Sequence, residues 1–96
     1  MTQVTLVSAD NGSIKGLVVS ALSEKERDLK LAIRQTEMKL LALEEKYAFS
    51  TQEFLAKFAR NEIQHSDDFD EWFGESRMLA HLQGKLAKLQ GIQIAE

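Results

Sequence analysis

Two long stretches of the chain repeat mostly apolar residues at spacings of three and four positions, which is the pattern of one face of an α-helix. The first stripe, between residues 23 and 48, consists of Leu29, Ile33, Thr36, Leu40, Leu43 and Tyr47. The second, between residues 66 and 91, consists of Phe69, Trp72, Ser76, Leu79, Leu82, Leu86 and Leu89. We therefore expect two long amphipathic helices. A weaker line through Leu31, Met38 and Leu41 widens the apolar face of the first.

Three serines are candidates for the N-caps of helices: Ser23, Ser50 and Ser66. The first two are each followed three positions later by a glutamate, which is the capping-box pattern. The second box predicts a short helix that runs to about Asn61. Carboxylates follow Ser66 in the first turn, where the helix dipole favours them, and Gly91 is a natural end for the last helix.

The N-terminal segment has a short strand pattern, because Val4 and Leu6 alternate with polar neighbours. Asp10–Gly12 is a strong turn signal, and a β-branched run follows it. We favour a hairpin of Val4–Ser8 with Ser13–Val19. The alternative is a single extended strand that leads directly into the first long helix.

The predicted fold is mainly α: an antiparallel helical hairpin of two long helices with a short corner helix, preceded by a short N-terminal β-strand or hairpin. We expect one domain over residues 1–96, with the strand segment at 1–21, the helical hairpin at 22–91 and a tail at 92–96. Two helices cannot enclose their own core, so apolar surface remains for another chain. The residues expected to form an oligomer interface are Leu29, Ile33, Leu40, Leu43, Leu79, Leu82 and Leu86.

Composition narrows the classes of function. The 96 residues include no cysteine and no proline, which excludes disulfides and thiolate metal sites and favours uninterrupted helices. Twelve basic and fifteen acidic residues give a net charge of −3, the wrong sign for binding nucleic acid by bulk electrostatics. We see neither a signal peptide nor an apolar run that could span a bilayer, and we expect a cytoplasmic protein with no membrane partner.

The densest polar patch lies between residues 61 and 75, with six acidic residues and no basic one. It lacks the ligand spacing of an EF-hand, and His65 and His81 have no HExxH-like pairing. No nucleophile elbow or phosphate-binding loop is present. We therefore expect no enzyme activity and no catalytic, cofactor-binding or metal-binding residues. The carboxylates are explained as helix N-capping charges, and they also suit a basic protein partner.

The residues expected to bind that partner form an acidic-aromatic corner: Asp67, Asp68, Phe69, Asp70, Glu71, Trp72, Phe73 and Glu75. Two interpretations of Trp72 remain open at this point. It either packs into the core where the short helix meets the last one, or it is exposed as a hot-spot anchor for the partner. Gly74 is costly inside a helix and indicates the close approach of another helix or chain.

The stretch from Glu44 to Leu86 resembles the small antitoxins of bacterial type II toxin–antitoxin modules, in particular those paired with TumE-type toxins. The resemblance rests on EEKY at Glu44–Tyr47, the S-x-x-E-F helix at Ser50–Phe54, the acidic segment Asp67–Trp72 and the Leu/Lys-rich helix at Leu79–Leu89. It implies a non-enzymatic antitoxin that binds and silences a cognate toxin, which would be a ribonuclease or a nucleotidyltransferase-like protein.

Two alternatives belong to other classes. The first is a self-assembling helical scaffold, in which identical chains pair into a four-helix bundle; a homodimer or a hetero-oligomer is expected in either case. The second is a DNA-binding autoregulator that uses a paired N-terminal strand. In this chain the basic residues near the start of the first helix are interleaved with acidic ones, which favours a solvated helix face over a DNA contact.

Overall fold

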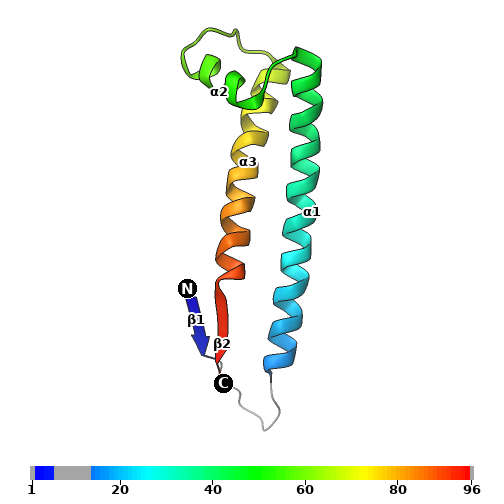
Figure 1. The fold of residues 1–96 in the computed structure, drawn as a ribbon, viewed down its shortest axis with the longest axis vertical. Coiled ribbons are helices and arrows are strands. Elements are labelled where there is room, and N and C mark those ends of the chain that lie inside the picture. The colour runs from blue at the N-terminus through cyan, green and yellow to red at the C-terminus, as the bar shows by residue number, and fades with distance from the viewer. Residues whose placement is uncertain (1, 6–13, 96) are drawn as a thin grey trace.

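The computed structural model describes residues 2–5 and 14–95, which form a rod with extents of 61 × 21 × 17 Å (Figure 1). The elements follow in the order β1 (Thr2–Thr5), α1 (Lys15–Tyr47), α2 (Thr51–Ala59), α3 (Asp67–Gln90) and β2 (Ile92–Ala95). The long helices α1 and α3 run antiparallel along the rod, and α2 crosses one end. The predicted fold class, a helical hairpin with a corner helix and a short N-terminal strand, is confirmed.

The helix α1 begins at Lys15, about two turns earlier than the sequence pattern predicts. The predicted second strand of the hairpin, residues 13–19, is therefore wrong from Lys15 onward, where the chain is helical. The alternative, a single strand that leads into the helix, is closer to the structure. Ser23 lies inside the helix and caps nothing. Helix propagation explains the difference, since β-branched residues reduce helix propensity by only a few tenths of a kcal/mol and nothing breaks the helix here. The predicted turn at Asp10–Gly12 lies outside the described residues.

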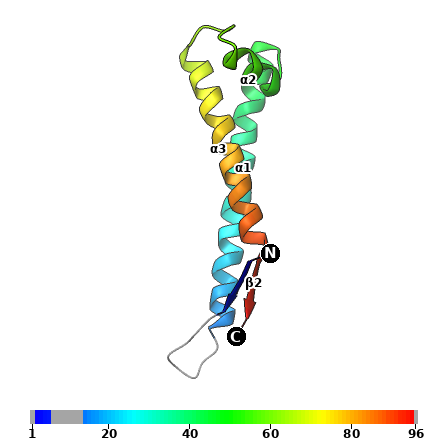
Figure 2. The same cartoon turned by 90° about the vertical axis from the view of Figure 1, so that its left-hand side faces the viewer.

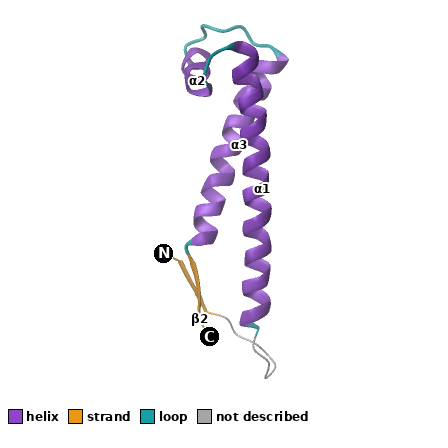
Figure 3. Ribbon diagram, turned by 45° about the vertical axis from the view of Figure 1, so that its right-hand side comes forward, coloured by secondary structure: helices purple, strands orange, loops and turns teal. Residues whose placement is uncertain are grey.

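The C-terminal segment, expected to be a tail, forms the strand β2. It pairs in parallel with β1, with Thr2 opposite Ile92 and Val4 opposite Ile94. Figures 2 and 3 show the two strands beyond the end of α3, and both chain termini lie at this end of the rod, opposite α2. Parallel strands need a long connection, which the three helices supply.

Two of the three predicted N-caps are confirmed. The Ser50 hydroxyl accepts a hydrogen bond from the Glu53 amide, and the Ser66 hydroxyl accepts one from the Phe69 amide, each at 3.1 Å. Gly91 ends α3 as predicted, and its amide donates to the Ala87 carbonyl.

The core lies at the corner end of the rod and consists of Leu40, Leu43, Phe54 and Trp72. Phe54 and Trp72 are both 0 % exposed, and their rings stack with centroids 4.3 Å apart. The weaker line through Leu31, Met38 and Leu41 does not widen this face as expected. All three side chains are exposed, because they lie on the side of α1 that faces away from α3.

Candidate functional site

Trp72 is the centre of the corner and belongs to its core. Besides Phe54, its ring stacks on Phe49 at 5.3 Å and on Tyr47 at 6.0 Å. The indole N–H donates to the hydroxyl of Thr51 at 2.9 Å, so the polar atom of this buried side chain is satisfied. With no exposed surface, Trp72 cannot contact a partner in this conformation. The structure thus places it in the corner core, and the alternative of an exposed anchor is wrong.

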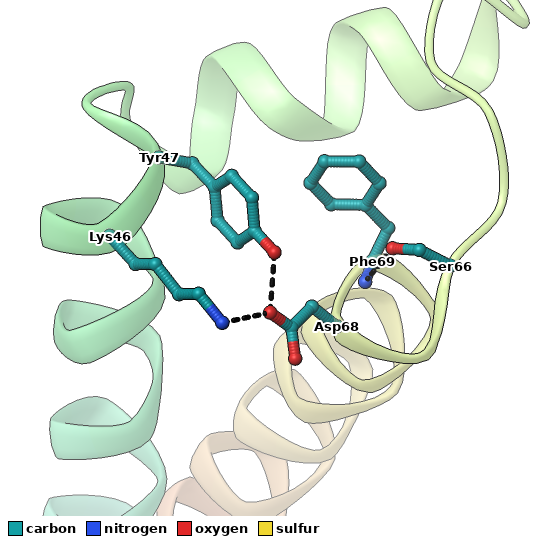
Figure 4. A network of polar contacts seen from close by, with 5 residues as sticks. All are labelled: Lys46, Tyr47, Ser66, Asp68 and Phe69. Atoms are coloured by element: carbon teal, nitrogen blue, oxygen red, sulfur yellow. Dashed lines mark hydrogen bonds and ion pairs between the residues drawn. The ribbon is translucent and has the colours of Figure 1, made fainter.

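Asp68 joins the end of α1 to the start of α3 (Figure 4). One carboxylate oxygen accepts from the Lys46 ammonium at 2.6 Å and from the Tyr47 hydroxyl. Each charge is also favoured by the dipole of its own helix, since the cationic Lys46 lies in the last turn of α1 and the anionic Asp68 in the first turn of α3. Asp68 is therefore a structural contact of the hairpin.

The same network shifts the three pKa values. The hydrogen bond from Lys46, with that from Tyr47, holds the pKa of Asp68 below its usual value. The hydrogen bond to Asp68 raises the pKa of Lys46 and that of Tyr47. The contribution of Asp68 to stability is therefore present above its unfolded pKa of about 4 and is lost as the pH falls through its lower folded pKa.

Replacing Asp68 with asparagine should lower the stability of the hairpin at neutral pH. Asp68→Asn removes the carboxylate that Lys46 and Tyr47 share, so its urea midpoint should lie below that of the wild type at pH 7 and approach it below about pH 4. Asp67→Asn is the matched control, since Asp67 is exposed in the same helical turn and its side chain has no hydrogen bond or ion pair among the described residues. Equal midpoint shifts in both variants would show that only the helix dipole is involved.

The exposed acidic residues lie elsewhere on α3. Asp67, Asp70 and Glu71 are exposed, and helical geometry turns Asp67 and Asp70 away from Trp72, with Glu71 at the edge of that side. Asp70 lies 2.9 Å from the ring nitrogen Nδ1 of the exposed His65. Three of the predicted corner carboxylates therefore remain available to a partner.

The other predicted partner residues are less available. Glu75 pairs with Lys39 of α1 at 3.4 Å and keeps only 20 % of its side chain exposed. Phe69 and Phe73 are half-buried and pack against the core cluster. Phe73 also stacks on Phe58 at 5.1 Å.

Two residues that the sequence pattern did not assign to the site share its outer surface. Gly74 has open space where a Cβ would lie, so no other helix among the described residues approaches it. One turn further on, Met78 is 48 % exposed. We call Asp67, Asp70, Glu71, Gly74 and Met78 the acidic face of α3. A spacing of three or four positions from Asp67 to Met78 was the signal that could have identified them.

A shallow pocket of about 640 Å³ lies between α2 and the segment that leads into α3. Phe49, Ile63 and Phe69 form its apolar part, and charged side chains line the rest. Lys57 extends over the Phe49 ring at 5.1 Å, and Arg60 is paired with Glu62 at 3.1 Å. The pocket can receive an apolar side chain of a partner. Phe69 is the aromatic residue of the expected corner that such a side chain would contact.

The predicted oligomer interface is largely used inside the single chain. Leu29, Leu40 and Leu43 are at most 9 % exposed, and Leu79 packs against the core cluster. The other three residues are half-buried: Ile33, Leu82 and Leu86. These stripes hold α1 and α3 together, so the most buried of them cannot also pair with a second chain in this conformation.

The opposite end of the rod is basic. Lys25, Lys85 and Lys88 surround a small pocket of about 240 Å³ with an apolar floor. The strand β1, which the DNA-binding hypothesis pairs with another strand, is paired here with β2 of the same chain. Over residues 2–5 and 14–95, no cluster of side chains has the composition of a metal site, and no helix is both long and apolar enough to cross a membrane.

Comparison with known protein families, with curated proteins and with solved structures finds no match to this chain. The chemistry of the corner is therefore the best guide to what this chain binds.

Proposed function

We propose that this chain is a non-enzymatic antitoxin that binds a basic cognate toxin through the acidic face of α3. The observation that carries the proposal is the exposure of Asp67, Asp70 and Glu71 around an uncovered glycine. A glycine inside a helix costs about 1 kcal/mol relative to alanine, and no neighbour within the described chain explains it. Gly84 of the same helix is equally open, but no acidic residue lies within four positions of it, so the neighbouring carboxylates single out Gly74 as the place where a partner backbone would pack closely.

The mechanism is occlusion. The three exposed carboxylates of the acidic face would pair with lysine or arginine side chains that otherwise hold RNA or a nucleotide on the toxin. A partner that extends around the N-terminal end of α3 would also place an apolar side chain in the pocket beside Phe69. Asp68 and Glu75 already have cationic partners in the hairpin, so we assign them to the support of this surface. Trp72 supports it from within the core.

The first test is a growth assay with the protein encoded beside this chain. We expect that protein to arrest growth alone, and co-expression of this chain to restore growth. Gly74→Gln should abolish the rescue without unfolding the chain, because the new side chain points into open space and improves helix propensity. Gly84→Gln is the matched control: Gly84 lies in the same helix with equally open surroundings, and its rescue should persist. A harmless neighbour, or one that stays toxic beside this chain, would refute the proposal.

Charge reversal tests whether the carboxylates of the acidic face pair with a basic partner. Glu71→Lys should weaken the purified complex by about tenfold or more, because a repulsive contact replaces an attractive one. The exposed Asp28 on α1, replaced by lysine, makes the same change in net charge away from the corner and should leave the affinity unchanged. Equal losses in both variants would mean that net charge matters and the corner does not.

The cytoplasm is the compartment that this proposal requires, since the toxins of such modules act on intracellular RNA or nucleotides. Self-assembly is compatible with it, because the acidic face lies on α3 and leaves the outer side of α1 free. The DNA-binding hypothesis has less support, since no described feature of β1 favours it.

A further inference from the structure

The side of α1 that faces away from α3 carries an apolar surface with no cover among the described residues. Leu31 and Leu41 are each 54 % exposed and Met38 is 65 % exposed. Thr36, on the opposite side of the same helix, is 6 % exposed and marks the direction of the hairpin interior. Three large apolar side chains in one line are more than scattered surface residues, and such a line marks an interaction site.

These residues belong to a longer regular series. Spacings of 4, 3, 4, 3 and 4 connect six positions, all exposed and all within about 40° of the direction opposite Thr36. We call this series the outer seam: Arg27, Leu31, Arg34, Met38, Leu41 and Glu45. Within the described chain none of the six side chains makes a hydrogen bond or an ion pair. This is the spacing of a coiled-coil interface, extending over about 27 Å of helix.

We propose that the outer seam binds the outer seam of a second copy of this chain, antiparallel, with the two-fold axis at the level of Thr36. An isologous dimer of this kind pairs each residue with a different one of the same series. Arg27 then meets Glu45 of the second copy, Leu31 meets Leu41, and Arg34 meets Met38. Each layer pairs an a position with a d position, as antiparallel coiled coils require.

The charges of the seam select this orientation. In the antiparallel register the basic end, Arg27, lies on the acidic end, Glu45, twice per dimer. A parallel pairing in register would place Arg27 on Arg27, Arg34 on Arg34 and Glu45 on Glu45, and like charges at a helix interface repel. Near the two-fold axis, Glu37 lies beside Arg34 of the second copy, so two arginines and two glutamates balance at the centre.

The charge distribution of the whole rod favours the same orientation. Residues 15–36 and 79–90, toward the strand end, carry seven basic and three acidic residues, whereas residues 37–78, toward the corner, carry five basic and ten acidic ones. An antiparallel pair lays the basic half of one copy along the acidic half of the other. Such complementary potentials steer association and set its orientation.

Sedimentation across a concentration series is the first test, made with the full chain. The wild type should form a reversible dimer. Leu31→Glu should abolish it, because a carboxylate replaces the apolar side chain of the Leu31–Leu41 layer. Leu17→Glu is the matched control, since Leu17 is a leucine of the same helix, 74 % exposed and outside the seam; its dimer should persist. A wild type that is monomeric at every concentration, or a dimer that survives Leu31→Glu, would overturn the proposal.

Cysteine cross-linking tests the register, and the absence of natural cysteines makes it clean. The double variant Leu31→Cys/Leu41→Cys should form a covalent dimer under mild oxidation. Leu31→Cys alone should not, because the two introduced sulfurs would be separated by ten residues, about 15 Å along the helix. A covalent dimer of the single variant would indicate a parallel pair and would overturn the proposed register.

Charge exchange gives an independent test. Arg27→Glu and Glu45→Arg should each raise the dissociation constant of the dimer by roughly tenfold, since each creates two like-charge contacts. The double variant should recover the wild-type value. Losses that add up in the double variant would overturn the Arg27–Glu45 pairing. All three tests are independent of the corner, because a monomeric variant can still bind a partner through α3.

Discussion

Trp72→Ala should lower the free energy of unfolding by about 3–5 kcal/mol, the usual effect of removing a large aromatic side chain from a core. Trp72 is fully buried and stacks on rings from three other positions. A small domain has a total stability of about 5–15 kcal/mol, so this loss is a large share of the total. Urea unfolding followed by circular dichroism measures the loss.

Two milder variants separate the ring from its polar atom. Trp72→Phe keeps an aromatic side chain in the stack and should be less harmful than alanine. Thr51→Val keeps the shape of Thr51 but removes the acceptor of the indole N–H, which should cost about 1–3 kcal/mol because a buried donor is left unsatisfied. If Trp72→Ala lowered stability by less than about 1 kcal/mol, Trp72 would not be a core residue.

The neighbouring pair Leu40 and Leu41 should respond in opposite ways to truncation. Leu40 is 6 % exposed in the core cluster, whereas Leu41 is 54 % exposed on the outer seam. Leu40→Ala should lower the free energy of unfolding by about 2–5 kcal/mol, and Leu41→Ala by about 0.5 kcal/mol or less when the chain is dilute enough to be monomeric. Urea unfolding at low concentration makes the comparison.

The dependence of stability on protein concentration distinguishes Leu40 from Leu41 in a second way. If the outer seam dimerises, the loss caused by Leu41→Ala should grow with protein concentration, because association stabilises only the wild type by mass action. The loss caused by Leu40→Ala is expected at every concentration. Equal losses for the two leucines in the monomer would mean that α1 is rotated relative to the arrangement described above.

Local signals made part of the fold predictable. Ser50 and Ser66 act over three residues, and their caps are observed. The same type of signal at Ser23 was misleading, since a capping box has an effect only where the helix has not already begun. The pairing of β1 with β2 was not predicted, because it joins residues 90 positions apart, from Thr2 to Ile92, and depends on the hairpin that brings them together. Ile92 and Ile94 alternate with polar neighbours, which is a strand pattern.

The corner could be located from sequence, but the roles within it could not. The carboxylate cluster is visible in the chain, whereas the partners of Asp68 and Glu75 come from α1, 22 and 36 residues away. Trp72 satisfied both a core and an anchor interpretation until the position of α2 was known. The apolar residues of the outer seam were visible in the sequence as a second apolar line along the first long helix. Which of its two lines faces the hairpin interior depends on how α3 packs against α1.

Hydrogen exchange of the chain, with and without the protein encoded beside it, tests the central claim most directly, because it maps the surface that the partner covers. Exchange should slow across the linker before α3 and the first turns of α3, residues 62–78. The outer seam, residues 27–45, should show the same exchange in both states at equal occupancy of the dimer. Protection confined to the outer seam, or no protection at residues 62–78 in a saturated complex, would contradict the assignment of the acidic face as the docking surface.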